Sequence, residues 1–236
     1  MPPVVVLSCK VLEGVLSPLL DSQPVQTIYM DYGLHRQPRT MAAALQAELD
    51  RLPMPSLVLI GYGLCGNGLV GLKAGPHTLV IPRTHDCIAL LLGSYEAYRR
   101  EFAAQPATYY LCKGWLESGD NPLAAYKEYV TRYGEETAEW LMNEQYQHYK
   151  RLIFVASDEA DREKYAPQAR AIAEFCRARW GMTYEERIGD NSYVARLVLA
   201  ASQPDSLDED LLIIPPGGEV TQRPFLRAPV TPTQPA

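Results

Sequence analysis

Four reactive side chains lie within five consecutive positions of this sequence. The run Arg83-Thr84-His85-Asp86-Cys87 combines a guanidinium, an imidazole, a carboxylate and a thiol. Arg83 is suited to binding a carboxylate or a phosphate, and His85 and Asp86 are side chains that act as general acids and bases. We therefore predict that Arg83, His85 and Asp86 orient or protonate a bound small molecule.

A glycine-rich segment, GYGLCGNG at residues 61–68, precedes this run. Because glycine lets the backbone approach a ligand closely, Gly63, Gly66 and Asn67 are predicted to contact a bulky ligand or a metal around Cys65. The alternative is a phosphate-binding turn. The spacing differs from GxGxxG before a helix, and the chain has no GK[ST] motif, so a nucleotide loop is the weaker interpretation.

The cysteines are the second source of candidate chemistry. Cys9, Cys65, Cys87 and Cys112 each lie at the end of a predicted strand or in the loop that follows it, whereas Cys176 lies within a predicted helix. The carboxyl ends of parallel strands share one edge of a sheet, and ligands bind in the crevice there. We therefore expect the first four thiols to lie along the same edge.

Thiolates beside one imidazole suit zinc or an iron–sulfur cluster and exclude magnesium and calcium. We predict Cys9, Cys65 and Cys87 as the ligands. The chain has no CxxC pair, so each ligand must come from a separate loop. Two alternatives stay open: the cysteines are small buried residues, or Cys87 is a nucleophile whose thiolate is stabilised at a helix N-terminus.

The elements that must position these residues alternate between short apolar strands and helices. The predicted strands are 4–7, 25–30, 57–60, 79–81, 107–112, 152–156, 182–187 and 211–214. The predicted helices are 12–20, 41–52, 86–92, 94–103, 123–149 with a break at Gly134, 165–180 and 193–201. Such alternation indicates parallel sheets with both faces covered.

We therefore predict an α/β fold with two Rossmann-like lobes, in which mainly parallel sheets are flanked by helices. Residues 1–120 form the N-terminal lobe with the Cys/His site. Residues 121–220 form a helical connection and the second lobe, and residues 221–236 form a proline-rich tail.

Composition narrows the class of protein. The net charge of −6 and the pI near 5.3 provide no general field that attracts nucleic acid. The longest apolar runs are far too short to span a membrane, and the start of the chain has no signal-peptide pattern. We expect a cytoplasmic protein that binds neither nucleic acid nor membrane.

Five segments resemble the family known as domain of unknown function 1638. They are LSCKVL, YGLCGNG, IPRTHDCIALLLGS, TYYLCKGW and IPPGGE, spread from the start of the chain to about residue 220. The resemblance implies that Cys9, Cys65, Arg83, His85, Asp86 and Cys87 are motif positions. Cys112 stands where a serine or threonine would be as readily expected.

Members of that family are often encoded near corrinoid-dependent methyltransferases. The resemblance therefore implies a role in methyl transfer, with any corrinoid held by a partner protein. Our first hypothesis is a metal- or cluster-binding protein that acts on a small molecule in one-carbon transfer. The alternatives are an accessory module that docks on a methyltransferase or corrinoid protein through residues 123–149 and the tail, and a metal-free thiol-dependent transferase.

Overall fold

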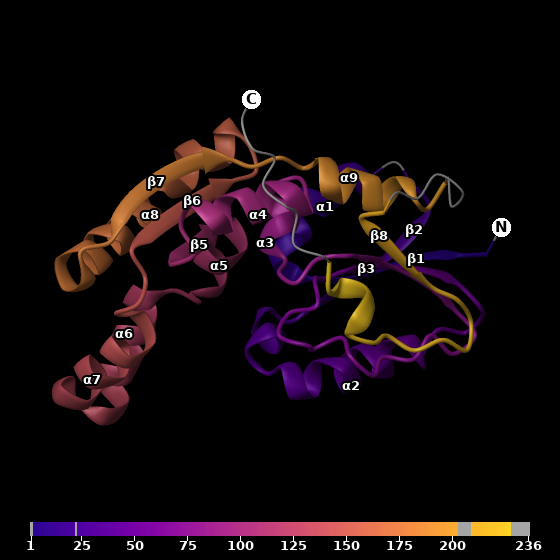
Figure 1. Cartoon of the computed structure of the whole chain (residues 1–236), viewed down its shortest axis with the longest axis horizontal. Helices are drawn as coiled ribbons and strands as arrows, with labels where there is room; N and C mark the ends of the chain where they lie inside the picture. Colours follow the sequence, from indigo (N-terminus) through magenta and orange to yellow (C-terminus); the bar gives the residue numbers. More distant parts are fainter. Residues whose placement is uncertain (1, 22, 203–208, 228–236) are drawn as a thin grey trace.

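The chain folds into two α/β lobes that lie side by side (Figure 1). The structure is a computed structural model, and it describes residues 2–21, 23–202 and 209–227. Each lobe contains one sheet with helices packed against it. The predicted fold class, two Rossmann-like lobes with mainly parallel sheets, is confirmed.

The first sheet has the strand order β2-β1-β3-β4-β8. Its strands are β1 (Val4–Cys9), β2 (Val25–Met30), β3 (Leu57–Gly61), β4 (Thr78–Pro82) and β8 (Leu211–Ile214). The first four strands are parallel, and β8 pairs with β4 in the antiparallel sense. The direction of strand addition reverses at β1, and a crevice between the ends of β1 and β3 is therefore the expected ligand position.

The second sheet is parallel and has the order β5-β6-β7. Its strands are β5 (Thr108–Cys112), β6 (Arg151–Ala156) and β7 (Thr183–Ile188). The central strand β6 is almost entirely apolar and buried, as expected for a parallel strand covered on both faces.

Helices connect the strands and cover the sheets. They are α1 (Glu13–Leu20), α2 (Pro38–Leu49), α3 (Ile88–Leu91), α4 (Tyr95–Ala104), α5 (Lys113–Ser118), α6 (Pro122–Tyr133), α7 (Glu135–Tyr146), α8 (Glu159–Trp180) and α9 (Ser192–Leu199), with short 3-10 turns η1 (Lys10–Leu12), η2 (Tyr32–Arg36) and η4 (Arg223–Phe225). The break between α6 and α7 occurs at Gly134, as predicted. Helix α2 begins earlier than predicted because Pro38 occupies its first turn, where proline is well tolerated.

The C-terminal part of the chain returns to the first lobe. Strand β8 completes the first sheet, and α9 packs against α1, α3, β3 and β4 (Figure 1). The division into residues 1–120 and 121–220 therefore differs from the structure, because residues from about 189 onward belong to the first lobe. The sequence did not predict this return, because the sequence pattern of a strand does not depend on which sheet the strand joins.

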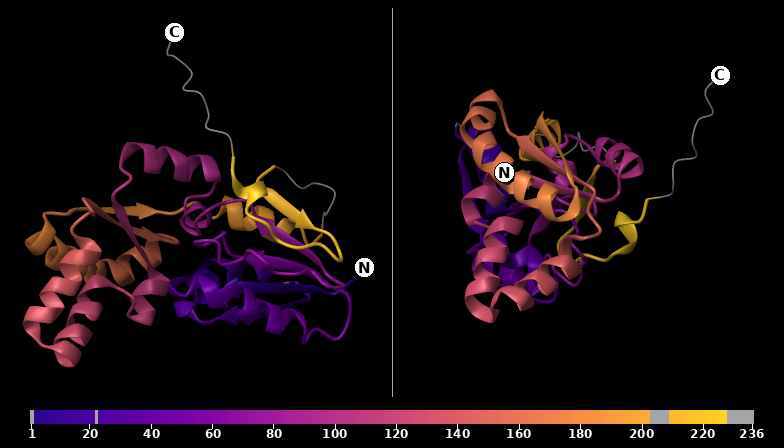
Figure 2. Two further views of the ribbon diagram at one scale, coloured as in Figure 1. Left: turned by 60° about the horizontal axis from the view of Figure 1, so that its bottom comes forward. Right: turned by 90° about the vertical axis from the view of Figure 1, so that its left-hand side faces the viewer.

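The described part of the predicted tail is also docked. Phe225 in η4 is fully buried, and so is Val220, the residue just before the tail. Figure 2 shows this segment lying over the first lobe. Residues 228–236 of the predicted tail lie outside the described residues. None of the helices that the structure describes combines the length and apolar character needed to cross a bilayer.

Candidate functional site

The loops that follow β3 and β4 are joined along their main chains. The Leu64 amide donates to the Thr84 carbonyl oxygen (2.8 Å), and the Cys65 amide donates to the His85 carbonyl oxygen (3.0 Å). A Cβ at Gly63 would lie 2.9 Å from the Asp86 carbonyl carbon, so only glycine allows this approach. Gly63, which we predicted as a ligand contact, therefore acts in packing the two loops together.

The backbone of the β3 loop is held in an uncommon conformation. Cys65 has φ 46° and Asn67 has φ 70°, both in the left-handed region that non-glycine residues rarely adopt. Gly66 between them has φ 65°. Strained residues of this kind gather at binding and catalytic sites, where the surrounding structure holds them in place. The loop thus fixes the position of Cys65.

Three thiols meet at this edge of the first sheet. Cys65 and Cys87 lie close together, and the interaction of the Cys87 thiol with Cys65, together with its partial burial, raises the pKa of Cys87 well above its usual value. Cys9 follows from the end of β1; its burial, with a smaller contribution from the nearby Cys65, raises its pKa to about 11. The structure thus brings Cys9, Cys65 and Cys87 together, from three separate strand ends.

Cys112 and Cys176 lie elsewhere. Cys112 lines a separate cavity of about 400 Å³ between α1 and α5, and burial raises its pKa to about 12. Cys176 is buried in the middle of α8, where burial likewise raises its pKa to about 12. Of the four thiols that were predicted to share one sheet edge, three therefore lie together and Cys112 does not.

Tyr62 lies directly beside the thiols. Its side chain is 1 % exposed, and its buried hydroxyl makes no well-formed hydrogen bond within the described chain. Burial, followed by the proximity of Cys9 and Cys65, raises its pKa. The Cys9 sulfur is close enough to interact with this hydroxyl, but the geometry of a hydrogen bond is not met, and a neutral thiol is a weak acceptor. A buried hydroxyl without a partner is costly and marks a place where an acceptor is missing.

The three thiols lie near one another, but their side chains do not point at a common metal position. Within the described ranges, no three His, Cys, Asp or Glu side chains are arranged so that they could hold a metal ion as they stand. Metal binding by Cys9, Cys65 and Cys87 therefore requires their side chains to rotate toward a common centre.

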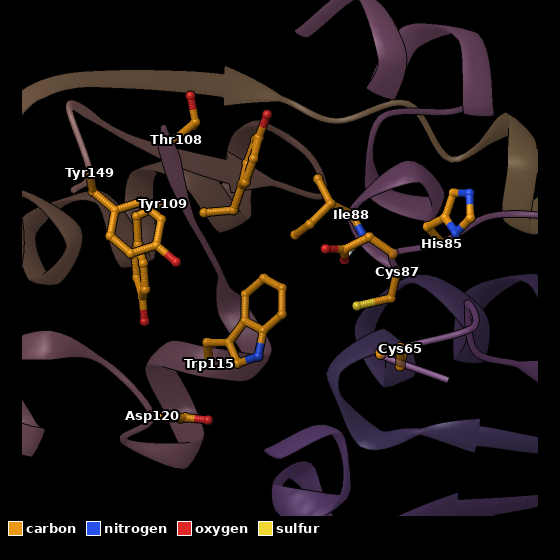
Figure 3. Close-up of a pocket in the computed structure, with 12 residues that line it drawn as sticks. Cys65, His85, Cys87, Ile88, Thr108, Tyr109, Trp115, Asp120 and Tyr149 are labelled. Atoms are coloured by element: carbon orange, nitrogen blue, oxygen red, sulfur yellow. Dashed lines mark hydrogen bonds between the residues drawn. The ribbon is translucent and has the colours of Figure 1, made fainter. Parts of the chain in front are cut away.

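Cys65 and Cys87 open onto a cleft between the two lobes, which we call the interlobe cleft. Its volume is about 360 Å³, and it is also lined by Gly66, His85, Asp86 and Ile88 from the first lobe. Figure 3 shows Cys87 reaching toward the cavity while the His85 ring is turned away from its far wall. A cleft of this size between two lobes is a common position for a small-molecule site.

The far wall of the interlobe cleft is aromatic. The second lobe contributes Tyr109, Trp115, Asp120 and Tyr149 (Figure 3). The rings of Tyr109 and Tyr149 meet edge to face at 5.3 Å between centroids. The tyrosine-rich middle of the chain indicated an apolar pocket wall, but Trp115 and Asp120 were not predicted, although the motif TYYLCKGW contains Trp115.

The predicted acid–base residues take different places. His85 and Asp86 both line the interlobe cleft, and the Asp86 Oδ1 also accepts a hydrogen bond from the Ile88 amide (2.9 Å) at the start of α3. Arg83 instead donates from its guanidinium to the main-chain carbonyl oxygens of Pro224 and Glu209. It holds the C-terminal segment, and a role for Arg83 on a bound molecule stays a prediction.

The predicted ligand-contacting residues of the glycine-rich loop also separate. Gly66 lines the interlobe cleft and has its other side against Pro38. The Asn67 carbonyl oxygen accepts from the Val70 amide (3.0 Å) in the turn that follows. Of the three predicted contacts, only Gly66 reaches the cleft directly.

Comparison with known proteins gives one match. The model of the family described as "Protein of unknown function (DUF1638)" matches residues 29–198, which is well over half of the chain. This span includes Cys65 and Cys87 and begins after Cys9. No curated protein and no solved structure matches the chain.

Proposed function

We propose a function for this chain, which belongs to the DUF1638 family: it binds a soft metal ion through Cys9, Cys65 and Cys87, beside a cleft that takes a small molecule. The observation that carries the proposal is the meeting of three thiols from three strand ends, of which Cys65 and Cys87 line the interlobe cleft and Cys9 is buried beside them. Zinc or an iron–sulfur cluster has the ligand preference that such a set meets.

The electrostatics of the site support a cation as the missing component. Cys9 has a raised pKa chiefly because it is buried, and Cys87 has a raised pKa because of its contact with Cys65 and its partial burial. They are therefore protonated and unreactive at neutral pH. A bound soft cation would deprotonate coordinating thiols outright, and a Cys9 thiolate would be a strong acceptor for the unpaired hydroxyl of Tyr62.

Three cysteine ligands would leave one position of a tetrahedral metal for a substrate atom. A metal there would act as a Lewis acid on that atom. His85 and Asp86, which line the same cleft, would hold or move a proton, and the aromatic wall of Tyr109, Trp115 and Tyr149 would exclude water. A place in corrinoid-dependent methyl transfer, with the corrinoid on a partner, is the finer form of the proposal and rests on the genetic setting of the family.

The raised pKa values of Cys9 and Cys87 give less support to a metal-free transferase. A catalytic thiol needs a lowered pKa, which a helix N-terminus or a nearby cation can provide. Cys87 does precede α3, but its pKa is raised. Burial thus works against the single reactive cysteine that this alternative requires.

The accessory role is favoured by one observation, the exposed aromatic residues of the α6–α7 hairpin. Trp140 is 61 % exposed and Tyr133 is nearly as accessible. Exposed aromatic residues of this kind are enriched where proteins dock. In this second proposal the hairpin binds a methyltransferase or corrinoid protein, and Trp140→Ala abolishes co-purification of that partner while the metal content is unchanged.

Elemental analysis of anaerobically purified protein tests the metal proposal. We expect stoichiometric zinc or iron in the wild-type protein, and at least a tenfold loss in Cys9→Ala, Cys65→Ala and Cys87→Ala. Cys176→Ala, which removes a buried thiol remote from the site, is the matched control and should retain the metal. Wild-type protein that is purified anaerobically and holds no zinc or iron would overturn the proposal.

A further inference from the structure

A groove on the surface of α4 adjoins the interlobe cleft. It has a volume of about 400 Å³ and is formed by His85 with Tyr95, Tyr98, Arg99 and Phe102 of α4. His85 lines both this groove and the interlobe cleft. Because the His85 ring is turned away from the aromatic wall of the cleft (Figure 3), it forms the boundary between the two cavities.

The floor of the α4 groove is an aromatic face that is half-buried at Tyr95 and Tyr98 and exposed at Phe102. Tyr95, Tyr98 and Phe102 are spaced by three and four residues and so share one side of the helix. None of the residues of α4, all of which the structure describes, is buried. Phe102 is 55 % exposed, and its ring lies 6.2 Å from that of Tyr98. Exposed apolar patches on a protein surface mark interaction sites.

Arg99 supplies one positive charge to the lining of the α4 groove. Arg99 makes no hydrogen bond or ion pair with any residue that the structure describes. The lining contains no carboxylate. The guanidinium of Arg227 lies over the Tyr95 ring at 4.3 Å, and its charge is paired with that of Asp210. The interlobe cleft, by contrast, contains Asp86 and Asp120. An elongated ligand that lies across His85 would therefore place its anionic group in the groove.

We propose that the α4 groove binds an apolar organic acid, an alkyl or aryl carboxylate, whose other end passes His85 into the interlobe cleft. The carboxylate pairs with the free guanidinium of Arg99, and the apolar body packs on Tyr98 and Phe102. The inference deepens the proposed function by naming a class of ligand for its cleft. It rests on the proposed function only for the contacts of the end of the acid that enters the interlobe cleft. Binding of the carboxylate in the α4 groove needs no metal.

Binding is measured on the full chain after removal of metal with a chelator. The probe is 8-anilinonaphthalene-1-sulfonate, an apolar anion that fluoresces when it enters an apolar site, and octanoate and octanamide compete with it. We expect one saturable site from which octanoate displaces the probe at least about tenfold better than octanamide, because only the acid pairs with Arg99. Equal competition by the acid and the amide would overturn the role of Arg99.

Variants locate the site. Arg99→Gln should weaken octanoate about tenfold and leave octanamide unchanged, whereas Phe102→Ser should weaken both ligands. Arg132→Gln and Trp140→Ala, which remove an exposed cation and an exposed ring on the α6–α7 hairpin, are matched controls and should bind normally. If the controls lose as much binding as Arg99→Gln and Phe102→Ser, the probe adheres to exposed apolar surface in general and the proposal is wrong.

Thiol protection tests whether the acid reaches the interlobe cleft. Dodecanoate should slow the alkylation of Cys65 by iodoacetamide about fivefold or more in the metal-free protein, and the shorter hexanoate should not. Absence of protection by the long acid would overturn the passage of the ligand past His85. Metal content, measured on Arg99→Gln, should equal that of wild type. Acid binding by a protein that never holds metal would leave this inference standing while the proposed function fails.

Discussion

Cys9 shows how burial governs the chemistry of a single side chain in this molecule. Its pKa is raised from 9.0 to about 11, chiefly by burial. The folded state therefore prefers the protonated thiol, and this preference contributes fully to stability below about pH 9. As the pH rises from 9 to 11, the unfolded chain loses the proton first, so the contribution of Cys9 declines and is lost above pH 11.

Alkaline unfolding of the metal-free protein measures this effect. Two pH units correspond to about 2.7 kcal/mol, so the difference in free energy of unfolding between wild type and Cys9→Ala should shrink by about 2 kcal/mol from pH 8 to pH 11. Val6→Ala, a buried and non-ionising position of the same strand, should cost the same at both pH values. A Cys9→Ala difference that is independent of pH contradicts the raised pKa.

At the scale of elements, the α6–α7 hairpin is tied to the interlobe cleft at its base. Asp120, just before α6, and Tyr149, just after α7, both line the cleft. The Asn121 side chain caps α6 by accepting a hydrogen bond from the Ala124 amide (3.0 Å), and Asn121 is buried. The capping residue of one surface helix therefore also positions one end of the cleft.

Substitution of this cap should be measurable in urea unfolding. Asn121→Ala removes the acceptor of the Ala124 amide and is expected to cost about 1 to 2 kcal/mol. Asn121→Ser keeps a capping oxygen and should recover most of that loss. If serine costs as much as alanine, Asn121 acts through packing and the assignment of a helix cap is incorrect.

Elements that are determined by neighbouring residues could be predicted from the sequence, whereas pairings between distant segments could not. The local signals were sufficient for β2 (Val25–Met30) and β8 (Leu211–Ile214), whose bounds match the predicted ranges, and for the break at Gly134. Helix α5 (Lys113–Ser118) was missed because it is short and directly continues β5. The pairing of β8 with β4 spans well over a hundred residues, and no local pattern encodes which sheet a strand joins.

The distinction between local and long-range information also explains which residues of the candidate site could be predicted. Strand ends predicted the meeting of Cys9, Cys65 and Cys87, because parallel strands share an edge whatever their order. They could not show that Cys112 faces a different cavity, since that depends on how the second lobe sits against the first. The position of Trp115 in the aromatic wall depends on the same arrangement and was missed for the same reason.

At the scale of the whole molecule, the seam between the lobes decides the shape of the interlobe cleft. The two lobes approach main chain to main chain where α5 meets η1. A Cβ at Gly114 would lie 2.7 Å from the Val11 Cα and 3.0 Å from the Val11 carbonyl oxygen. Both contacts are backbone, so no side-chain rotation would relieve them. Trp115, the next residue, lines the cleft, and a shift of α5 would therefore widen it.

Gly114→Ala tests this coupling between the seam and the site. We expect a loss of about 1 to 3 kcal/mol in the free energy of unfolding from overpacking, with faster alkylation of Cys65 in the native protein as the cleft opens. Gly14→Ala is the matched control across the same seam, because its Cβ would meet only the flexible end of Lys113 at 3.4 Å. As a helical position it should gain up to about 1 kcal/mol. A Gly114→Ala protein as stable as wild type, with Cys65 alkylated at an unchanged rate, would show that the lobes adjust at this contact without disturbing the cleft.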